Sequence, residues 1–363
     1  MTMTVPASAS LIQPLPDGPL DVVGDIHGEW DAFQQLMQHL GYDAQGRHPQ
    51  GRKLIFVGDL CDRGPDSPAV IERVADWVAA GRAWVTIGNH EINLLANDAK
   101  DGSAWFFDAR IASDRDRYEP YARATDAGQR QAIRDFFASL PVALERDDLR
   151  VVHAAWSEPQ IQAVRALPLG QVGQYWNQYE EETNREARQG SLATRMLQES
   201  RDWPHSLEDG AHPPPFLPAH ADKELSKAMH NPIKVLITGV ERRGSVPFFA
   251  GNKWRFVERV SWWDGYDQPT PVIVGHYWRR DPGVSRGPAH KGDLHMFEQI
   301  PTHAWHGLRH NVFCVDYSVG GRWISRRNGQ PPIGAFRLAA MRWPERELVF
   351  DDGERVPSTA FGA

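Results

Sequence analysis

The stretch LIFVGDLCDRG, residues 54–64, decides the fold, because four apolar residues run directly into a glycine followed by acidic and basic side chains. The same order recurs in LDVVGDIHG at residues 20–28 and in AWVTIGNHE at residues 83–91. Each apolar run is short, rich in β-branched residues and without regular polar alternation, which indicates a strand covered on both faces. Between these runs, apolar residues recur at helical spacing over residues 30–40 and 70–78. This alternation predicts strand–helix–strand units built on a parallel sheet.

The rest of the chain is expected to form one domain with an insertion. Further strands are predicted over residues 149–152, 235–238, 254–260, 272–274, 312–315, 336–341 and 348–350. Residues 157–231 are instead polar, helix-compatible and poor in β-branched residues, so we expect an inserted, cap-like helical segment there. The sequence therefore predicts a single domain over residues 19–356, with residues 1–18 and 357–363 as flexible termini.

Composition excludes several classes of protein. Of 363 residues, 41% are hydrophobic and 24% charged, which allows a substantial core and argues against a disordered chain. Cys61 and Cys314 are too few for a disulfide scaffold and suit a reducing compartment. No stretch approaches the roughly 20 apolar residues of a membrane span, and no secretory signal precedes residue 18, so we expect a cytoplasmic protein. The net charge of −7 gives no overall positive field, so strong nucleic-acid or membrane binding is not expected.

Metal-seeking side chains follow five of the expected strands. They are Asp25, His27, Asp59, Asn89, His90, His153 and His276. Because strand ends of one sheet converge on one edge, residues far apart in sequence can share a pocket there. Asp, His and Asn offer oxygen and nitrogen ligands to divalent transition metals, and a carboxylate such as Asp59 can bridge two ions. Taken singly, Asp25, Asp59 and Asp62 could be ordinary helix caps or turn residues; their recurrence at strand ends favours a metal centre.

The blocks GDIHG, GDLCDRG and GNHE, the later His153 and the pair Gly275-His276 occur in this order. In this respect the chain resembles the calcineurin-like metallophosphoesterases, and within them the phosphoprotein phosphatase branch. The resemblance implies an α/β fold in which two stacked mixed β-sheets are flanked by helices as a four-layer sandwich, here with a helical insertion. It also implies an enzyme that hydrolyses phosphate esters with two divalent metal ions. Manganese is favoured, and iron or zinc also fit mixed nitrogen and oxygen ligands.

The resemblance also implies roles for individual residues. Asp25, His27 and Asp59 would bind one metal ion, and Asp59, Asn89, His153 and His276 the second. His90 would be the general acid that protonates the leaving alkoxide, oriented by Asp62, and imidazole titrates near neutral pH as this role requires. Arg63, together with Asn89, would hold the phosphoryl oxygens, for which a planar guanidinium is suited. A second phosphate-binding arginine is expected at Arg242 or Arg243, with Arg279 as a weaker candidate.

Two departures from the family pattern bear on the substrate. The sequence Gly275-His276-Tyr277-Trp278 lacks the second histidine of the Gly-His-x-His ending, and His153-Ala154-Ala155 replaces His-Gly-Gly, which resembles the bacterial relatives. We therefore expect first a phosphatase acting on a phosphorylated protein or a small phosphate ester, by attack of a metal-bridging hydroxide without a phospho-enzyme. The alternative is a hydrolase of dinucleoside polyphosphates such as diadenosine tetraphosphate, of nucleotides, or of RNA-end phosphates. An inactive binding module is a distant third.

Overall fold

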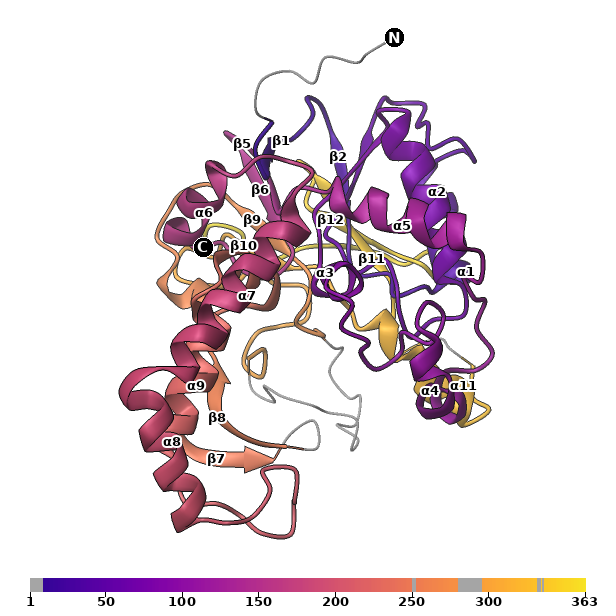
Figure 1. Ribbon diagram of the computed structural model, residues 1–363. Coiled ribbons are helices and arrows are strands. Elements are labelled where there is room, and N and C mark those ends of the chain that lie inside the picture. Colours follow the sequence, from indigo (N-terminus) through magenta and orange to yellow (C-terminus); the bar gives the residue numbers. More distant parts are fainter. Residues whose placement is uncertain (1–8, 250–252, 280–295, 332–333, 335) are drawn as a thin grey trace.

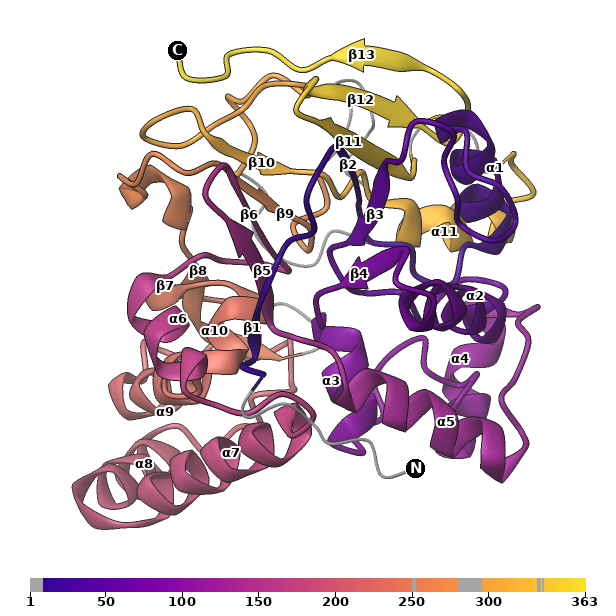
Figure 2. The same cartoon turned by 90° about the horizontal axis from the view of Figure 1, so that it is seen from above.

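Two stacked mixed sheets form the centre of the molecule (Figure 1). The computed structural model describes residues 9–249, 253–279, 296–331, 334 and 336–363. The view from above places α1 (Trp30–Leu40) and α2 (Ser67–Ala79) on one side of the sheets, and α6 (Glu158–Arg165) and α10 (Pro232–Thr238) on the other (Figure 2). The expected α/β class, with two mixed sheets flanked by helices, is therefore confirmed.

The larger sheet has six strands in the order β13-β12-β11-β2-β3-β4. Their bounds are Arg355–Pro357 for β13, Glu347–Phe350 for β12, Ala339–Trp343 for β11, Leu20–Val23 for β2, Lys53–Phe56 for β3 and Ala83–Val85 for β4. β2, β3 and β4 are parallel neighbours, whereas β11 runs antiparallel to β2. The three parallel strands are those of the three opening sequence blocks, so the polar residues after them reach the same edge.

The smaller sheet has five strands in the order β1-β5-β6-β9-β10. Their bounds are Ile12–Pro14 for β1, Ala143–Arg146 for β5, Leu149–Val152 for β6, Val272–Val274 for β9 and Val312–Cys314 for β10. β5 and β6 form an antiparallel pair, and β6, β9 and β10 are parallel neighbours. β6 and β9 thus present the residues after them on a common side.

The core explains why the strand sequences are apolar without alternation. Along β3, Ile55 packs between the two sheets, whereas Leu54 and Phe56 on either side of it pack beneath the helices. Val151 of β6 and Phe313 of β10 meet Ile55 in the layer between the sheets. All five side chains are fully buried, and each such burial contributes about 1.5–3 kcal/mol. Both faces of these strands are therefore covered, as the sequence pattern predicted.

Further helices surround the sheets. They are α3 (Asn89–Leu95), α4 (Ile111–Tyr118), α5 (Ala127–Ala138) and α11 (Arg322–Arg327), with short 3-10 helices η1 (Asp108–Arg110), η2 (Trp262–Gly265) and η3 (Val319–Gly321). α2 shows why a helix begins where it does, since the Asp66 side chain accepts the Ala69 N–H at 3.0 Å and Pro68 lies in the first turn. No helix in the described ranges combines the length and the apolar character needed to cross a bilayer.

One part of the chain projects from the two sheets (Figure 1). It consists of α7 (Val172–Arg188), α8 (Gly190–Asp202), α9 (Pro218–Met229) and the two-stranded sheet of β7 (Glu241–Phe249) and β8 (Trp254–Arg259). A small separate core of Leu217, Ala221 and Phe256 holds α9 against this sheet. Most of the projecting part comes from residues 157–231, which are helical except mainly for the stretch 203–217. That this segment acts as a cap stays a prediction.

Several local predictions differ from the structure. Residues 235–238, predicted as a strand, belong to α10, because the Asn231 side chain accepts the N–H groups of Ile233 and Lys234 and Pro232 occupies the first turn. The termini are also more ordered than predicted. Residues 12–14 form β1 and pair with β5, and Phe361 packs edge-to-face on Trp305, with their ring centroids 4.8 Å apart. Residues 1–8 of the expected flexible terminus lie outside the described residues.

Candidate metal centre

The ends of five strands bring the predicted metal ligands together. Asp25 and His27 follow β2, Asp59 follows β3, Asn89 and His90 open α3 after β4, His153 follows β6 and His276 follows β9. Two sets of three side chains have ligand atoms within 4.8 Å of one another: His27, Asp59 and His90, and Asp59, His153 and His276. Asp59 is common to both sets, which makes its carboxylate the centre of the cluster.

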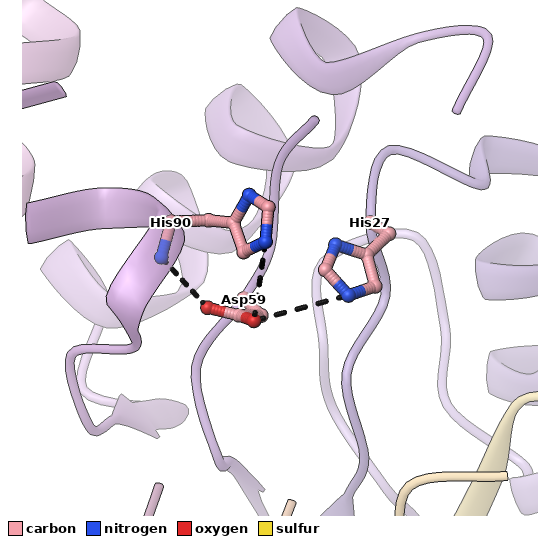
Figure 3. A group of neighbouring side chains, drawn as sticks. All are labelled: His27, Asp59 and His90. Atoms are coloured by element: carbon pink, nitrogen blue, oxygen red, sulfur yellow. Dashed lines mark hydrogen bonds and ion pairs between the residues drawn. The ribbon is translucent and has the colours of Figure 1, made fainter. Parts of the chain in front are cut away.

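Asp59 faces imidazole nitrogens from three strand ends. Two of these rings, those of His27 and His90, are drawn with Asp59 in Figure 3. Its Oδ2 lies 3.4 Å from His153 Nε2, 3.8 Å from His27 Nε2 and 3.9 Å from His90 Nε2. Its Oδ1 accepts the backbone N–H of His90 at 3.0 Å. The backbone N–H holds one oxygen of this buried carboxylate, and the other oxygen faces the three imidazole rings.

The other predicted ligands complete the cluster. Asn89 Oδ1 lies 3.2 Å from His153 Nε2. The Asp25 carboxylate accepts the backbone N–H of His276, with the nitrogen 3.0 Å from Oδ2. The structure therefore places every residue predicted as a metal ligand in one group. His153 and His276 follow strands of the five-stranded sheet, and the others follow strands of the six-stranded sheet.

The imidazoles are arranged as metal ligands require. His27 Nδ1 lies 3.0 Å from the Cys61 carbonyl oxygen, and His153 Nδ1 lies 2.8 Å from that of Val57. Because a carbonyl oxygen can only accept, each Nδ1 carries the proton and donates it, which turns Nε2 toward Asp59. Within the described residues, the buried Nε2 of His276 has no hydrogen-bond partner. This donor set fits divalent transition metals.

Charge supports the same interpretation. Asp25, Asp59, Glu91 and Asp316 are all buried in or beside the cluster. Burial, and then the neighbouring Asp316, raise the pKa of Asp25 well above its usual range, and burial raises the pKa of Asp316 to about 6. Burial alone would also raise the pKa of Asp59, but His153 and the other two imidazoles hold it well below its usual range. So many buried carboxylates are stable as anions only beside cations, and bound divalent ions would supply that charge.

His90 has a different partner from the other histidines. Its Nδ1 lies 2.5 Å from Oδ2 of Asp62, a carboxylate that is fully buried. The imidazole N–H donates to the carboxylate, and this fixes the ring so that Nε2 faces the cluster.

Arg63 lies over the same group of imidazoles. Its Nη1 is 3.0 Å from His27 Nε2 and its Nη2 is 3.1 Å from His90 Nε2. Its guanidinium also stacks 5.1 Å from the ring centroid of Trp278, a cation–π contact that keeps the plane oriented. Arg63 is thus positioned to meet an anion that approaches the cluster.

Backbone strain is concentrated in these loops. Of the eleven non-glycine residues with positive φ in the described ranges, six belong to the site: His27, Asp59, Asp62, Arg63, His276 and Trp278. Each costs on the order of 1–3 kcal/mol and persists only where the surroundings enforce it. Glycines permit the tightest approaches, since a Cβ at Gly88 would lie 2.3 Å from Asp59 Oδ1 and one at Gly275 would lie 2.0 Å from Asp25 Oδ1.

Two buried carboxylates hold the loops in place. Glu91 accepts the backbone N–H groups of Gly88, Asp59 and Leu60 at 2.7–2.9 Å, so it supports the ligand loop instead of facing the cluster. Asp316 accepts the N–H groups of Trp278 at 2.8 Å and Ser318 at 2.7 Å. Sequence reasoning did not assign a role to Asp316, although an acidic residue just after a predicted strand is the signal that identified Asp25 and Asp59.

The candidates for a second phosphate-binding arginine do not lie where the sequence placed them. Arg242 and Arg243 are exposed on β7 and form ion pairs with Glu258 and Asp222. Arg279 is buried and donates to backbone carbonyls, among them that of Ala304 at 2.7 Å. A carboxylate partner or a buried position leaves these guanidinium groups poorly placed for substrate.

Arg259, on β8, packs against Tyr277, the residue after His276, and sequence reasoning did not single it out. Its guanidinium lies 5.9 Å from the ring centroid of Tyr277. Tyr277 in turn packs edge-to-face on His276, with their ring centroids 5.1 Å apart. Burial, and then the charge of Arg259, lower the pKa of His276 well below its usual range. No motif surrounds Arg259 in the sequence, so only the pairing of β8 with β7 could have located it.

Residues 18–189 match the model of the calcineurin-like phosphoesterase family. The matched part is a little under half of the chain. Among curated proteins, the chain is 48% identical over 73 residues to the bis(5'-nucleosyl)-tetraphosphatase PrpE [asymmetrical] of Anoxybacillus flavithermus. The aligned stretch covers 19% of this chain and 30% of that relative, so the chain matches less than a third of the relative's length.

Solved structures with a similar arrangement are more distant in sequence. A protein serine/threonine phosphatase from Saccharomyces cerevisiae aligns over 97% of this chain and 85% of its own, with a TM-score of 0.46 and 11% identity. A cold-active protein-tyrosine phosphatase of a psychrophilic Shewanella species aligns over 96% and 83%, with a TM-score of 0.44 and 15% identity.

Proposed function

We propose that this chain is a phosphoesterase with a dinuclear metal centre that hydrolyses phosphate monoesters, such as those of phosphoserine and phosphothreonine. The observation that carries the proposal is the position of Asp59, whose carboxylate belongs to two sets of metal-type ligands at once. One ion would be held by Asp25, His27 and Asp59, and the other by Asp59, Asn89, His153 and His276. Manganese is the proposed metal, because it accepts mixed imidazole, amide and carboxylate ligands.

The chain's own residues would bind the phosphoryl group and move a proton. Two such cations, when bound, would activate water as a nucleophile and would neutralise charge on the phosphoryl transition state. Arg63 and Asn89 would hold the phosphoryl oxygens, and we assign the second arginine to Arg259 in place of Arg242 or Arg243. His90, oriented by Asp62 at 2.5 Å, would give its Nε2 proton to the leaving oxygen.

A second candidate function is the hydrolysis of dinucleoside tetraphosphates. The observation that favours it is the 48% identity over 73 residues to a protein named a bis(5'-nucleosyl)-tetraphosphatase. The bond broken would again link phosphorus to oxygen, so the same cluster would serve, and only the groups that recognise the leaving group would differ.

The two candidates can be separated by their products. The protein would be loaded with manganese and assayed on p-nitrophenyl phosphate, a phosphopeptide and diadenosine tetraphosphate. Faster release of phosphate from the phosphopeptide is the expected result. Cleavage of diadenosine tetraphosphate with little activity on the phosphopeptide would reverse the ranking, and no turnover under manganese, iron or zinc would favour a binding module.

The variant Asp59→Asn tests the metal centre itself. An amide cannot supply the charge of a bridging carboxylate, so we expect metal content and activity to be lost together. Metal would be measured by mass spectrometry of the purified protein and activity with p-nitrophenyl phosphate. Asp21→Asn is the matched control, because Asp21 is equally buried on β2 but pairs with Arg52 at 2.9 Å. It should lower thermal stability and keep the metal content; two ions retained by Asp59→Asn would contradict the proposal.

A further inference from the structure

We propose that Trp105 is a positioning residue for proton transfer, because its indole N–H holds the oxygen of Asp62 that His90 does not use. The inference rests on the proposed role of His90 as the acid. Trp105 Nε1 lies 2.5 Å from Asp62 Oδ1, and His90 Nδ1 lies 2.5 Å from Asp62 Oδ2. The three groups form a chain from indole to carboxylate to imidazole.

Burial makes this contact consequential. Both Asp62 and Trp105 are excluded from solvent, so water does not compensate for a lost donor and an unpaired carboxylate oxygen there is costly. With one donor on each oxygen, the carboxylate plane cannot rotate freely, and the direction of the bond to His90 is fixed. Indole donates but neither accepts nor releases a proton near neutral pH. Trp105 can therefore orient Asp62 without competing with His90 for the proton.

The loop that carries Trp105 is itself fixed. The ring packs edge-to-face on Phe106, with centroids 5.3 Å apart, and the carbonyl of Trp105 accepts the N–H of Ala124 at 2.9 Å. The buried Asp114 accepts the N–H groups of Gly102 and Ala104 at 3.1 and 3.0 Å. The indole is therefore presented to Asp62 from a well-braced backbone.

The same loop also contacts the phosphate-binding side of the site. The Gly102 carbonyl accepts the backbone N–H of Arg63 at 3.0 Å. One loop thus supports both neighbours, Asp62 through the indole of Trp105 and Arg63 through a backbone carbonyl. The two contacts are chemically separate, so a substitution that removes only the indole N–H should affect proton transfer and leave phosphate binding intact.

The test uses Trp105→Phe, which keeps an aromatic ring and removes the donor. Phenyl phosphate has a poor leaving group, and we expect its turnover to fall about tenfold. This is the lower end of the loss caused by removing a hydrogen-bond partner that orients a functional side chain. Turnover of p-nitrophenyl phosphate, whose leaving group needs little protonation, and the KM of both substrates should stay close to those of the parent protein. In a His90→Asn background, Trp105→Phe should have no further effect, because residues that act as a unit are not additive.

Trp343→Phe is the matched control. Trp343 is also buried and donates its indole N–H to a carboxylate, Asp148 Oδ2, at 2.8 Å. It lies on β11 opposite Leu20, at the end of β2 away from the cluster. This variant should change the two substrates equally or not at all. If Trp105→Phe also lowers both equally, or if its effect adds fully to that of His90→Asn, Trp105 serves packing alone and the proposal is overturned.

Two results separate this proposal from the proposed function. If His90→Asn shows no preference for good leaving groups, the acid role of His90 fails; if it does and Trp105→Phe does not, only the present proposal fails. A second measurement leaves Trp105 unchanged, so it tests the contact even if the Trp105→Phe variant does not fold. In protein labelled with ¹⁵N-tryptophan, Asp62→Asn should move one indole N–H resonance upfield, since an amide oxygen is the weaker acceptor. No movement would show that the contact does not exist.

Discussion

At the scale of single residues, the partner at Nδ1 separates the roles of the histidines. His27 and His153 donate Nδ1–H to backbone carbonyls, whereas His90 donates to the carboxylate of Asp62. In all three, Nε2 faces Asp59. A neutral carbonyl orients a ring whose Nε2 offers a lone pair, while the carboxylate of Asp62 fixes the ring that is proposed to transfer a proton. The same side chain is thereby suited to binding a metal at two positions and to giving up a proton at the third.

His90→Asn tests that distinction. Asparagine can still donate to Asp62 but cannot transfer a proton, so we expect the variant to keep its metal and to lose about 10² to 10⁴ in turnover. Turnover of phenyl phosphate and the metal content of the purified protein would be measured together. A loss of less than tenfold on this poor leaving group, or loss of the metal, would exclude His90 as the acid.

At this scale the sequence identified residues in the turns after buried strands and missed residues elsewhere. Asp25, Asp59 and His153 could be predicted because such a turn has a recognisable sequence and a known direction. The role proposed for Arg259 could not be predicted, because this residue lies within a strand of the projecting sheet, and the pairing of that sheet is not encoded in a local motif. Arg242 was predicted only from its position in the sequence between His153 and His276. Its exposed ion pair with Glu258 shows that such a position does not determine where the side chain lies in the fold.

At the scale of elements, α10 shows how capping can override a local apolar pattern. Residues 235–238 are apolar and β-branched, which predicted a strand, yet Asn231 and Pro232 begin a helix three residues earlier. Because α10 is buried on nearly every side, its sequence lacks the polar face that recurs every three to four residues in an amphipathic helix. Its Leu236 carbonyl accepts the N–H groups of Ala154 and Ala155, so α10 supports the loop after His153.

The contribution of this cap can be measured with Asn231→Ala. The Asn231 side chain is buried and accepts from Ile233 N at 3.1 Å and Lys234 N at 3.3 Å. Its removal should lower the free energy of unfolding by about 1–2 kcal/mol, measured by urea denaturation of metal-free protein. Asn328→Ala, at an exposed position, should change it by less than about 0.5 kcal/mol. Equal effects of the two variants would show that the cap does not stabilise α10.

At the scale of the whole molecule, the proposed ligands come from both sheets. Asp59 follows β3 of the six-stranded sheet, while His153 and His276 follow β6 and β9 of the five-stranded sheet. Cations held at this edge would therefore link the two sheets in the native state only. Any ligand that binds the folded state alone stabilises it by mass action, so we expect manganese to raise the unfolding temperature of the entire domain.

The size of that stabilisation should depend on pH through His153. Burial alone would lower its pKa, but Asp59 beside it raises the pKa to about 10. A group whose pKa is raised on folding stabilises the metal-free protein fully below its unfolded value near 6.5, and this contribution is lost as the pH rises toward 10. Manganese must displace that proton, so its affinity should rise about tenfold per pH unit for each proton displaced.

The gap between unfolding temperatures with and without manganese should therefore widen from about pH 6 to about pH 8, because the metal-free protein loses stability while metal binding strengthens. Scanning fluorimetry at fixed manganese concentration would measure the gap, and Asp59→Asn, which lacks the bridging charge, should show no gap at any pH. A gap that is constant across this range in the parent protein would mean that no proton leaves on binding. That result would contradict a protonated His153 in the metal-free cluster, because an imidazole that already offers its Nε2 lone pair has no proton for manganese to displace.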